Sequence, residues 1–189
     1  MQPKIQTRIL LILLLAGLLL AACSALPTRV SSKPTPTPTP STPEWFGMQM
    51  TDVLTGQAFS MNDFAGMVVL VETMATWCPT CWKQENEVKR LQGLLGAASD
   101  LVIVSLDVDT NENEATLKDF ATTGKYAWRF AVTPLLVARA LGNLYSADLL
   151  NPPLAPMLFI DRQGGVYGLP NGVKGAESLQ KTLAPYLNP

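Results

Sequence analysis

The sequence has no histidine and only three cysteines, Cys23, Cys78 and Cys81, among its 189 residues. Structural zinc sites need four ligands, which are mostly cysteine and histidine. A site built on Cys78 and Cys81 would lack two of these ligands, because Cys23 lies far away in a leader region. The scarcity of both residue types therefore argues against zinc, and we expect no metal.

Positive charge is also scarce. Lysine and arginine number 14 against 15 aspartates and glutamates, and they form no basic patch. Nucleic acids and acidic membranes are bound through such patches. We therefore expect no nucleic-acid partner and no electrostatic attachment to a membrane.

The apolar segment near the N-terminus is too short to cross a bilayer readily. It runs from Ile9 to Leu20 after Lys4 and Arg8, whereas a spanning helix needs about 20 residues. The pattern is typical of an export signal over residues 1–22. The sequence Leu20-Ala-Ala-Cys23 resembles the lipobox of bacterial lipoproteins, which implies that Cys23 is lipidated. An uncleaved anchor and an ordinary signal peptide are the alternatives.

Residues 23–43 are rich in serine, threonine and proline and cannot bury a core. Alternating prolines favour extended polyproline II, so we expect a tether, with an SH3-type docking motif as the alternative. Without residues 1–22 the chain has 12 basic and 15 acidic residues, a net charge of −3. Residues 44–189 are enough for one domain with a real core.

The central motif joins a strand to a helix through Cys78-Pro-Thr-Cys81. The apolar run Met67 to Met74 is long enough for one buried strand. After the cysteines the apolar residues recur at helical spacing, on a face made of Cys81, Val88, Leu91 and Leu95. Pro79 suits the first helical turn, where a missing N–H costs nothing.

This placement gives the two cysteines different chemistry. A helix start favours an anion, so the Cys78 thiolate is expected to be stabilised. Cys81 lies one turn along and can resolve a mixed disulfide formed on Cys78. A purely structural disulfide is the alternative, although so short a loop stabilises the fold by only about 2 kcal/mol.

The segment from Asp63 to Cys81, above all Ala75-Thr-Trp-Cys-Pro-x-Cys81, resembles thioredoxin-like thiol-disulfide oxidoreductases of the TlpA/ResA type. The resemblance implies an α/β fold with a central mixed sheet flanked by helices and an N-terminal hairpin. It departs from the family at Asn86, where a proline is usual, and at Thr73-Met74, where Phe-Trp is frequent.

The resemblance also implies a site. Cys78 and Cys81 would be catalytic, Trp77 and Pro79 would shape the client surface, and Pro156 would be a cis-proline beside the pair. Ala155 would offer backbone hydrogen bonds to the client. The expected partners are thiols or disulfides of exported proteins and a membrane electron donor. We expect no cofactor, a monomer, and an extracytoplasmic location with a lipid anchor in the cell membrane.

Glu72 interrupts the apolar strand six residues before Cys78. The resemblance implies that this position matches a buried acid beneath the cysteine pair of thioredoxin itself, whereas many TlpA-like relatives carry an amide there. Burial without a cationic partner would raise the pKa of Glu72, so that it could hold or take the proton of Cys81. A carboxylate at a solvated strand edge, or one paired with a surface lysine, is the alternative.

The remaining pattern predicts a small α/β domain. Asp107, Asp109, Glu112 and Glu114 follow one strand and could suggest a metal, but they lack the spacing of a calcium loop. The predicted elements are a hairpin within Trp45–Asp63, strands at Leu101–Leu106, Tyr126–Phe130, Met157–Ile160 and Val166–Gly168, and helices from Asn111 or Asn113 to Thr123, Pro134–Tyr145 and Ala176–Ala184. In the Pro134–Tyr145 helix, Leu136, Ala140 and Leu144 share one side.

A function from another class is also open. The domain could be a non-enzymatic binding lipoprotein that uses the disulfide as a staple, with a reduction potential below about −300 mV and an inert thiol.

Overall fold

The computed structural model describes residues 42–96 and 100–187, and the expected signal, Cys23 and nearly all of the tether lie outside these ranges. In chain order the elements are the short 3-10 turns η1 (Glu44–Gly47) and η2 (Met61–Phe64), separated by strands β1 (Met50–Thr51) and β2 (Ala58–Phe59), then β3 (Val68–Met74), α2 (Pro79–Leu95), β4 (Leu101–Asp107), α3 (Glu114–Gly124), β5 (Arg129–Val132), α4 (Leu135–Leu144), the 3-10 turns η3 (Ala147–Leu150) and η4 (Pro152–Leu154), β6 (Met157–Ile160), β7 (Val166–Gly168) and α5 (Ala176–Leu187).

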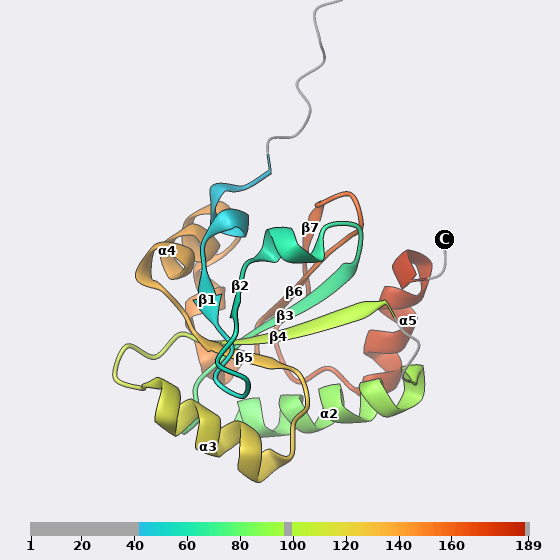
Figure 1. Ribbon diagram of the computed structural model, residues 1–189. Helices are drawn as coiled ribbons and strands as arrows, with labels where there is room; N and C mark the ends of the chain where they lie inside the picture. The colour runs from blue at the N-terminus through green and yellow to red at the C-terminus, as the bar shows by residue number, and fades with distance from the viewer. Residues whose placement is uncertain (1–41, 97–99, 188–189) are drawn as a thin grey trace, which may run out of the picture. The chain divides into compact units, whose positions relative to one another are not determined.

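The main sheet has five strands in the order β5-β4-β3-β6-β7 (Figure 1). β3 is central, parallel to β4 and antiparallel to β6. All seven of its residues are buried, because helices cover both faces of the sheet. The expected hairpin is present as β1 and β2, which pair antiparallel in a separate small sheet.

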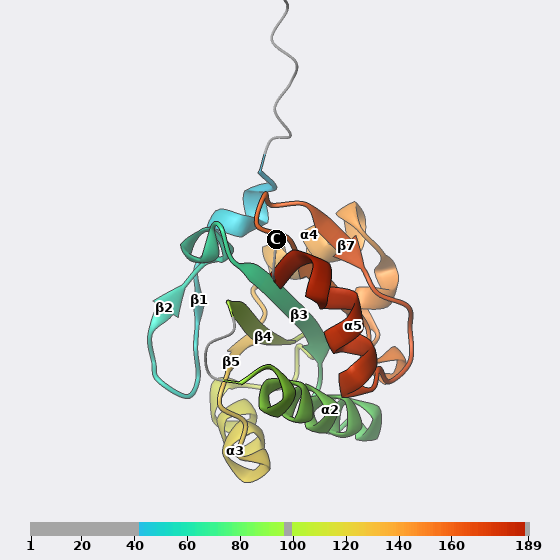
Figure 2. The ribbon, with the colours of Figure 1, turned by 90° about the vertical axis from the view of Figure 1, so that its right-hand side faces the viewer.

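Alternation along β3 sends its side chains into two cores. Val68, Leu70 and Met74 pack in one core with residues of α2, α3 and α5. Val69 and Val71 pack in the other with η1, η2 and α4. Figure 2 shows α2 and α5 side by side on the first face. The mixed sheet between helices agrees with the predicted fold class.

One predicted element needs correction, and for one helix the structure shows which side is buried. The segment after α3 begins its strand at Arg129 rather than Tyr126, because Lys125 takes the left-handed conformation and the Tyr126 N–H still bonds the Ala121 carbonyl of the helix end. In α4 the side with Leu136 and Leu144 is mostly exposed, and the buried residues are Val137 and Leu141. The helix is apolar on several sides, so its sequence does not show which side meets the sheet.

Within the described ranges, none of the helices combines the length and the hydropathy that a membrane span needs.

Candidate thiol site

Cys78 lies at the N-cap of α2, directly after the turn that follows β3. Its Sγ accepts a hydrogen bond from the Cys81 backbone N–H at 3.3 Å and lies 3.4 Å from the Thr80 hydroxyl oxygen. Pro79 is the first residue of the helix, as its sequence position predicts. Cys78 Sγ thus lies at a helix start, beside one N–H donor and one hydroxyl group.

Cys81 lies one turn further and faces inward. Burial raises the pKa of its thiol, and its Sγ donates to the carbonyl oxygen of Pro152 at 3.5 Å. Both Cys78 and Cys81 are free thiols. The two sulfurs therefore differ in environment, because Cys78 Sγ accepts an N–H at the helix start whereas Cys81 Sγ faces inward.

Neither cysteine is exposed, since each has a relative accessibility of 0%. Trp77, immediately before them, is 57% exposed, and Pro79 is exposed as well. A disulfide of another protein can reach Cys78 only if part of its cover moves. The η4 turn, which supplies the Pro152 carbonyl, lies against Cys81.

The acidic loop after β4 holds the turn before Cys78. The Thr76 N–H and hydroxyl both donate to the Glu112 carboxylate, at 3.0 and 2.6 Å. The Trp77 indole N–H donates to Asp109 at 2.6 Å. These two acids are therefore occupied with the thiol loop, a role that their sequence spacing did not suggest. Within the described ranges, no three potential metal ligands among histidine, cysteine, aspartate and glutamate come together.

Glu72 is buried, as an acid that holds or takes the Cys81 proton was expected to be. Its accessibility is 1%, and neither carboxylate oxygen has a hydrogen-bond partner. Burial raises the pKa of Glu72 well above its ordinary value, and the nearby Glu85 raises it further. The charge of Lys174 opposes this rise, but the Lys174 ammonium donates its hydrogen bonds to the carbonyls of Ala155 and Gly172 instead.

A second buried acid, Glu85, was not predicted from the sequence. It is fully buried on α2, and both of its oxygens also lack hydrogen-bond partners. Burial raises the pKa of Glu85 to about 8, although Ser105 and Trp128, which bond to each other, lie close enough to oppose the rise. One signal could have revealed it: Glu85 stands four residues after Cys81, on the helix face predicted to be apolar.

Pro156 differs from the expectation. No peptide bond among the described residues is cis, so the expected cis bond at Pro156 is wrong for this structure. Ala155 precedes it in the left-handed conformation, with φ of 44°. The Ala155 N–H bonds the Pro152 carbonyl, and its own carbonyl accepts from Lys174. Both backbone groups that were expected to bind a client are therefore already used within the domain.

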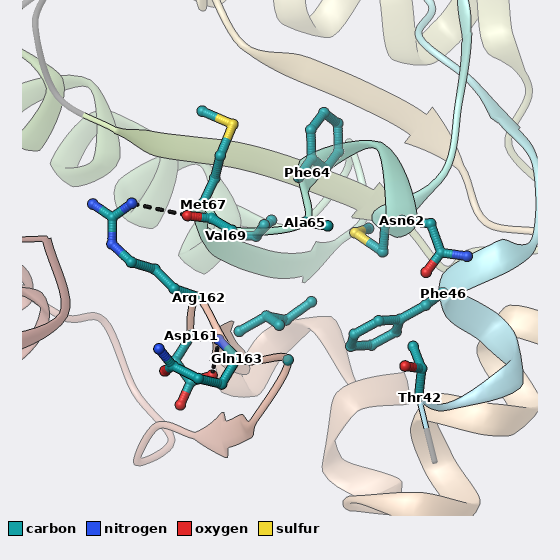
Figure 3. A pocket seen from close by; sticks show the side chains of 14 residues that line it. Thr42, Phe46, Asn62, Phe64, Ala65, Met67, Val69, Asp161, Arg162 and Gln163 are labelled. Carbon is teal, nitrogen blue, oxygen red and sulfur yellow. Dashed lines mark hydrogen bonds between the residues drawn. The ribbon is translucent and has the colours of Figure 1, made fainter. Parts of the chain in front are cut away.

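Two of the hollows in the described part of the chain lie next to Pro156 and next to the start of β3. A groove of about 460 Å³ opens beside Pro156, between the α4–η3 junction and the end of β7. A smaller cavity of about 140 Å³, shown in Figure 3, is lined by Phe46, Phe64 and Arg162 at the start of β3. The Arg162 guanidinium there bonds the Gly66 carbonyl at 2.8 Å. Because Cys78 follows the opposite end of β3, the smaller cavity is not part of the thiol site.

Comparison with known proteins assigns the chain to a family. The family model described as Redoxin matches residues 36–183. A thiol:disulfide interchange protein of the thioredoxin family from Chlorobium tepidum has a similar structure, with a TM-score of 0.64 and 20% identity over 75% of this chain and 93% of that one.

Two further structures are similar. One is a secreted thiol-disulfide isomerase from Corynebacterium glutamicum, with a TM-score of 0.62 and 15% identity over 75% of this chain and 84% of that one. The other is a secreted Mycobacterium tuberculosis disulfide oxidoreductase, with a TM-score of 0.60 and 12% identity over 75% and 98%. The thioredoxin-like fold expected from the sequence is thereby confirmed.

Proposed function

Since this chain belongs to the Redoxin family of oxidoreductases, we propose that it is a thiol-disulfide oxidoreductase that reduces or exchanges disulfides in exported proteins. The asymmetry of the cysteine pair supports this proposal most directly. Cys78 occupies a helix start and accepts an N–H, whereas burial keeps the proton on Cys81. A pair that served only as a staple would not need this difference.

The chemistry proceeds in two displacements. In the reducing direction, the Cys78 thiolate attacks a client disulfide, an S–S bond forms between Cys78 and the client, and the second client sulfur leaves as a thiolate. Cys81 then gives up its proton, and its sulfur attacks Cys78 Sγ and expels the first client sulfur. The client gains two electrons and two protons, and Cys78 and Cys81 end as a disulfide. Disulfide exchange uses the same two displacements, which are reversible.

Glu72 is the group proposed to hold or take the Cys81 proton. It is buried on the β3 face that packs against α2, and neither of its carboxyl oxygens has a hydrogen-bond partner. A carboxylate that accepts a proton in a dry site makes resolution easier without exposing the mixed disulfide to water.

Trp77 and Pro79 are proposed as the surface on which the client docks, because both are exposed next to the buried Cys78. Pro156 is proposed to belong to the same client surface, because it lines the groove of about 460 Å³. Ala155 can bond a client backbone only after Lys174 releases its carbonyl.

The finer type that we propose is a TlpA/ResA-like lipoprotein, held outside the cytoplasm by lipid on Cys23 and spaced from the membrane by residues 23–43. The short apolar segment before Leu20-Ala-Ala-Cys23 supports this location. A monomer that receives electrons from a membrane donor fits such a tether. The clients are then the thiols or disulfides of exported proteins.

The test is to trap the mixed disulfide. A Cys81→Ser variant should accumulate clients linked to Cys78, which non-reducing electrophoresis and mass spectrometry would identify. The Cys78→Ser variant is the matched control and should trap none. Equal trapping by both variants, or none by either together with a reduction potential below about −300 mV, would favour the binding lipoprotein with a structural disulfide.

A further inference from the structure

Glu85 and Glu72 face the same core layer from opposite sides. Glu72 belongs to the β3 face that packs on α2, together with Leu70 and Met74. Glu85 is buried on α2, one turn beyond Cys81. The sheet and the helix therefore each contribute one carboxyl to the layer beneath the cysteine pair.

Between them lies a small polar patch in an apolar core. Ser105 is the β4 neighbour of Glu72 in the strand register, and its hydroxyl oxygen accepts from the Trp128 indole at 2.9 Å. Ser105 and Trp128 lie close to Glu85 and oppose the rise of its pKa, but all four carboxyl oxygens of Glu72 and Glu85 lack a hydrogen-bond partner. Burying two charges there would be very costly, so at most one carboxyl can be ionised at a time.

We propose that Glu85 is a positioning residue for the resolving step, which acts through Glu72: the two carboxyls form one unit beneath Cys81, and Glu85 sets the pH at which Glu72 can accept the Cys81 proton. This inference rests on the proposed thiol-disulfide function.

The titratable groups around the unit come from three parts of the chain. Cys78 and Cys81 lie at the N-cap and in the first turn of α2, Tyr126 lies in the segment before β5, and Lys174 lies in the loop before α5. Burial raises the pKa of Tyr126 to about 12 and lowers that of Lys174 to about 8. Below that pH Lys174 is the only cation among these groups, and it is bound to two carbonyls. It therefore does not form an ion pair with either acid.

The mechanism follows from like charge. When Glu85 is ionised, a second charge on Glu72 is strongly disfavoured, so Glu72 keeps its proton to higher pH. When Glu85 is replaced by the neutral, isosteric glutamine, that repulsion is lost. Glu72 then ionises at lower pH and becomes available as a proton acceptor for Cys81 at lower pH.

The first experiment needs no client. The side-chain carboxyl carbons of Glu72 and Glu85 are followed by ¹³C NMR in the reduced wild-type protein as the pH rises, and again for Glu72 in Glu85→Gln. We expect two shared titration steps in the wild type, and a single Glu72 step in the variant that lies lower by about one pH unit or more. The exposed Glu114→Gln should leave the Glu72 curve unchanged.

Two results would overturn the proposal. One is an identical Glu72 curve in wild type and Glu85→Gln, and the other is a wild-type Glu85 that titrates near its ordinary pKa. The wild-type titration decides the matter even if the variant does not fold.

The second experiment measures resolution of a glutathione mixed disulfide on Cys78 against pH. Glu85→Gln should move the profile towards acid by a similar shift, and should have no further effect in a Glu72→Gln background. An equal shift in that background would show that Glu85 does not act through Glu72. A wild-type protein that resolves no mixed disulfide at any pH would refute the proposed function, whereas the NMR titration would still test the acid unit.

Discussion

Thr76 and Glu112 join the turn before the cysteines to the loop after β4 through the Thr76 backbone N–H and hydroxyl, both of which donate to the Glu112 carboxylate. The Thr76 carbonyl in turn accepts from the Trp82 indole at 2.9 Å. All three polar groups of Thr76 are thus fixed by side chains from other parts of the chain. The position of Cys78 at the start of α2 depends on this turn.

Glu112→Ala should therefore loosen the thiol loop. Hydrogen bonds to a charged group contribute about 1.5–3 kcal/mol when buried. Because Glu112 is partly exposed, we expect a loss of about 1–2 kcal/mol in the free energy of unfolding, measured by urea unfolding. The rate of thiol-disulfide exchange between the protein and a small disulfide should also fall. Asp119→Ala, which removes an exposed acid of α3, is the control. An unchanged rate in Glu112→Ala would mean that the turn holds its shape without this contact.

The two thiols should differ in alkylation. Iodoacetamide at neutral pH should modify Cys78 before Cys81, because only Cys78 accepts an N–H at a helix start while burial raises the pKa of Cys81. Peptide mass spectrometry after short reaction times identifies the modified residue. Faster labelling of Cys81 in the reduced protein would reverse the assigned roles.

Glu72→Gln should slow resolution of the Cys78 mixed disulfide and alter its dependence on pH, because the amide cannot accept the Cys81 proton. The first attack by Cys78 and the fold should be largely retained. Stopped-flow measurement of each step separates the two effects. Resolution rates that match the wild type from about pH 5 to 9 would exclude the role of Glu72.

Stability should fall as the pH rises from about 5 to 8. Glu72 and Glu85 have raised pKa values in the folded protein, at about 8 for Glu85, so in this range the folded state binds more protons than the unfolded one. Each such group then costs about 1.4 kcal/mol per pH unit above its unfolded pKa. The stabilising contribution of the two protonated carboxyls is complete below their unfolded pKa values, and it is lost as the pH rises through their folded pKa values, about 8 for Glu85.

The double variant Glu72→Gln/Glu85→Gln should flatten this decline and be more stable than the wild type at pH 8, as measured by urea unfolding at several pH values. Part of the slope should remain, because burial also raises the pKa of Asp107 to about 7. Glu114→Gln should retain the full wild-type slope. A parallel decline in the double variant would show that both acids ionise normally.

Cys23→Ala should release the protein from membranes, since acyl chains on Cys23 are the proposed anchor and each buried methylene contributes about 0.8 kcal/mol. Cell fractionation measures the release, and intact-mass analysis of the wild type gives the N-terminus. A mature chain that begins elsewhere and carries no acyl group would contradict the anchor.

Local patterns predicted the core of the site well. The run from Val68 to Met74, Pro79 after Cys78, and the inward Cys81, Val88 and Leu91 depend on neighbours in sequence, and they lie where the periodicity placed them. Asn113, one of the two N-cap candidates of the sequence, caps α3 through its side chain.

Features that depend on distant contacts were not predictable in the same way. The side of α4 that is buried depends on where the sheet lies, so Val137 and Leu141 could not be distinguished from Leu136 and Leu144. The tertiary partners of Asp109 and Glu112 could not be read from their spacing. Glu85 could have been noticed at its apolar position, but its neighbour Glu72 comes from another element.

The antiparallel pairing of β3 with β6 also bears on the order in which the domain can fold. The register joins Val69 to Ile160 and Glu72 to Met157, so β3 has only one strand partner until nearly the whole domain is available. Such distant pairings are slow to form. The Pro152 carbonyl that meets Cys81 arrives in the same late segment. A chain that emerges with its N-terminus first therefore presents its two thiols well before it can enclose them, and during that interval they are open to premature oxidation.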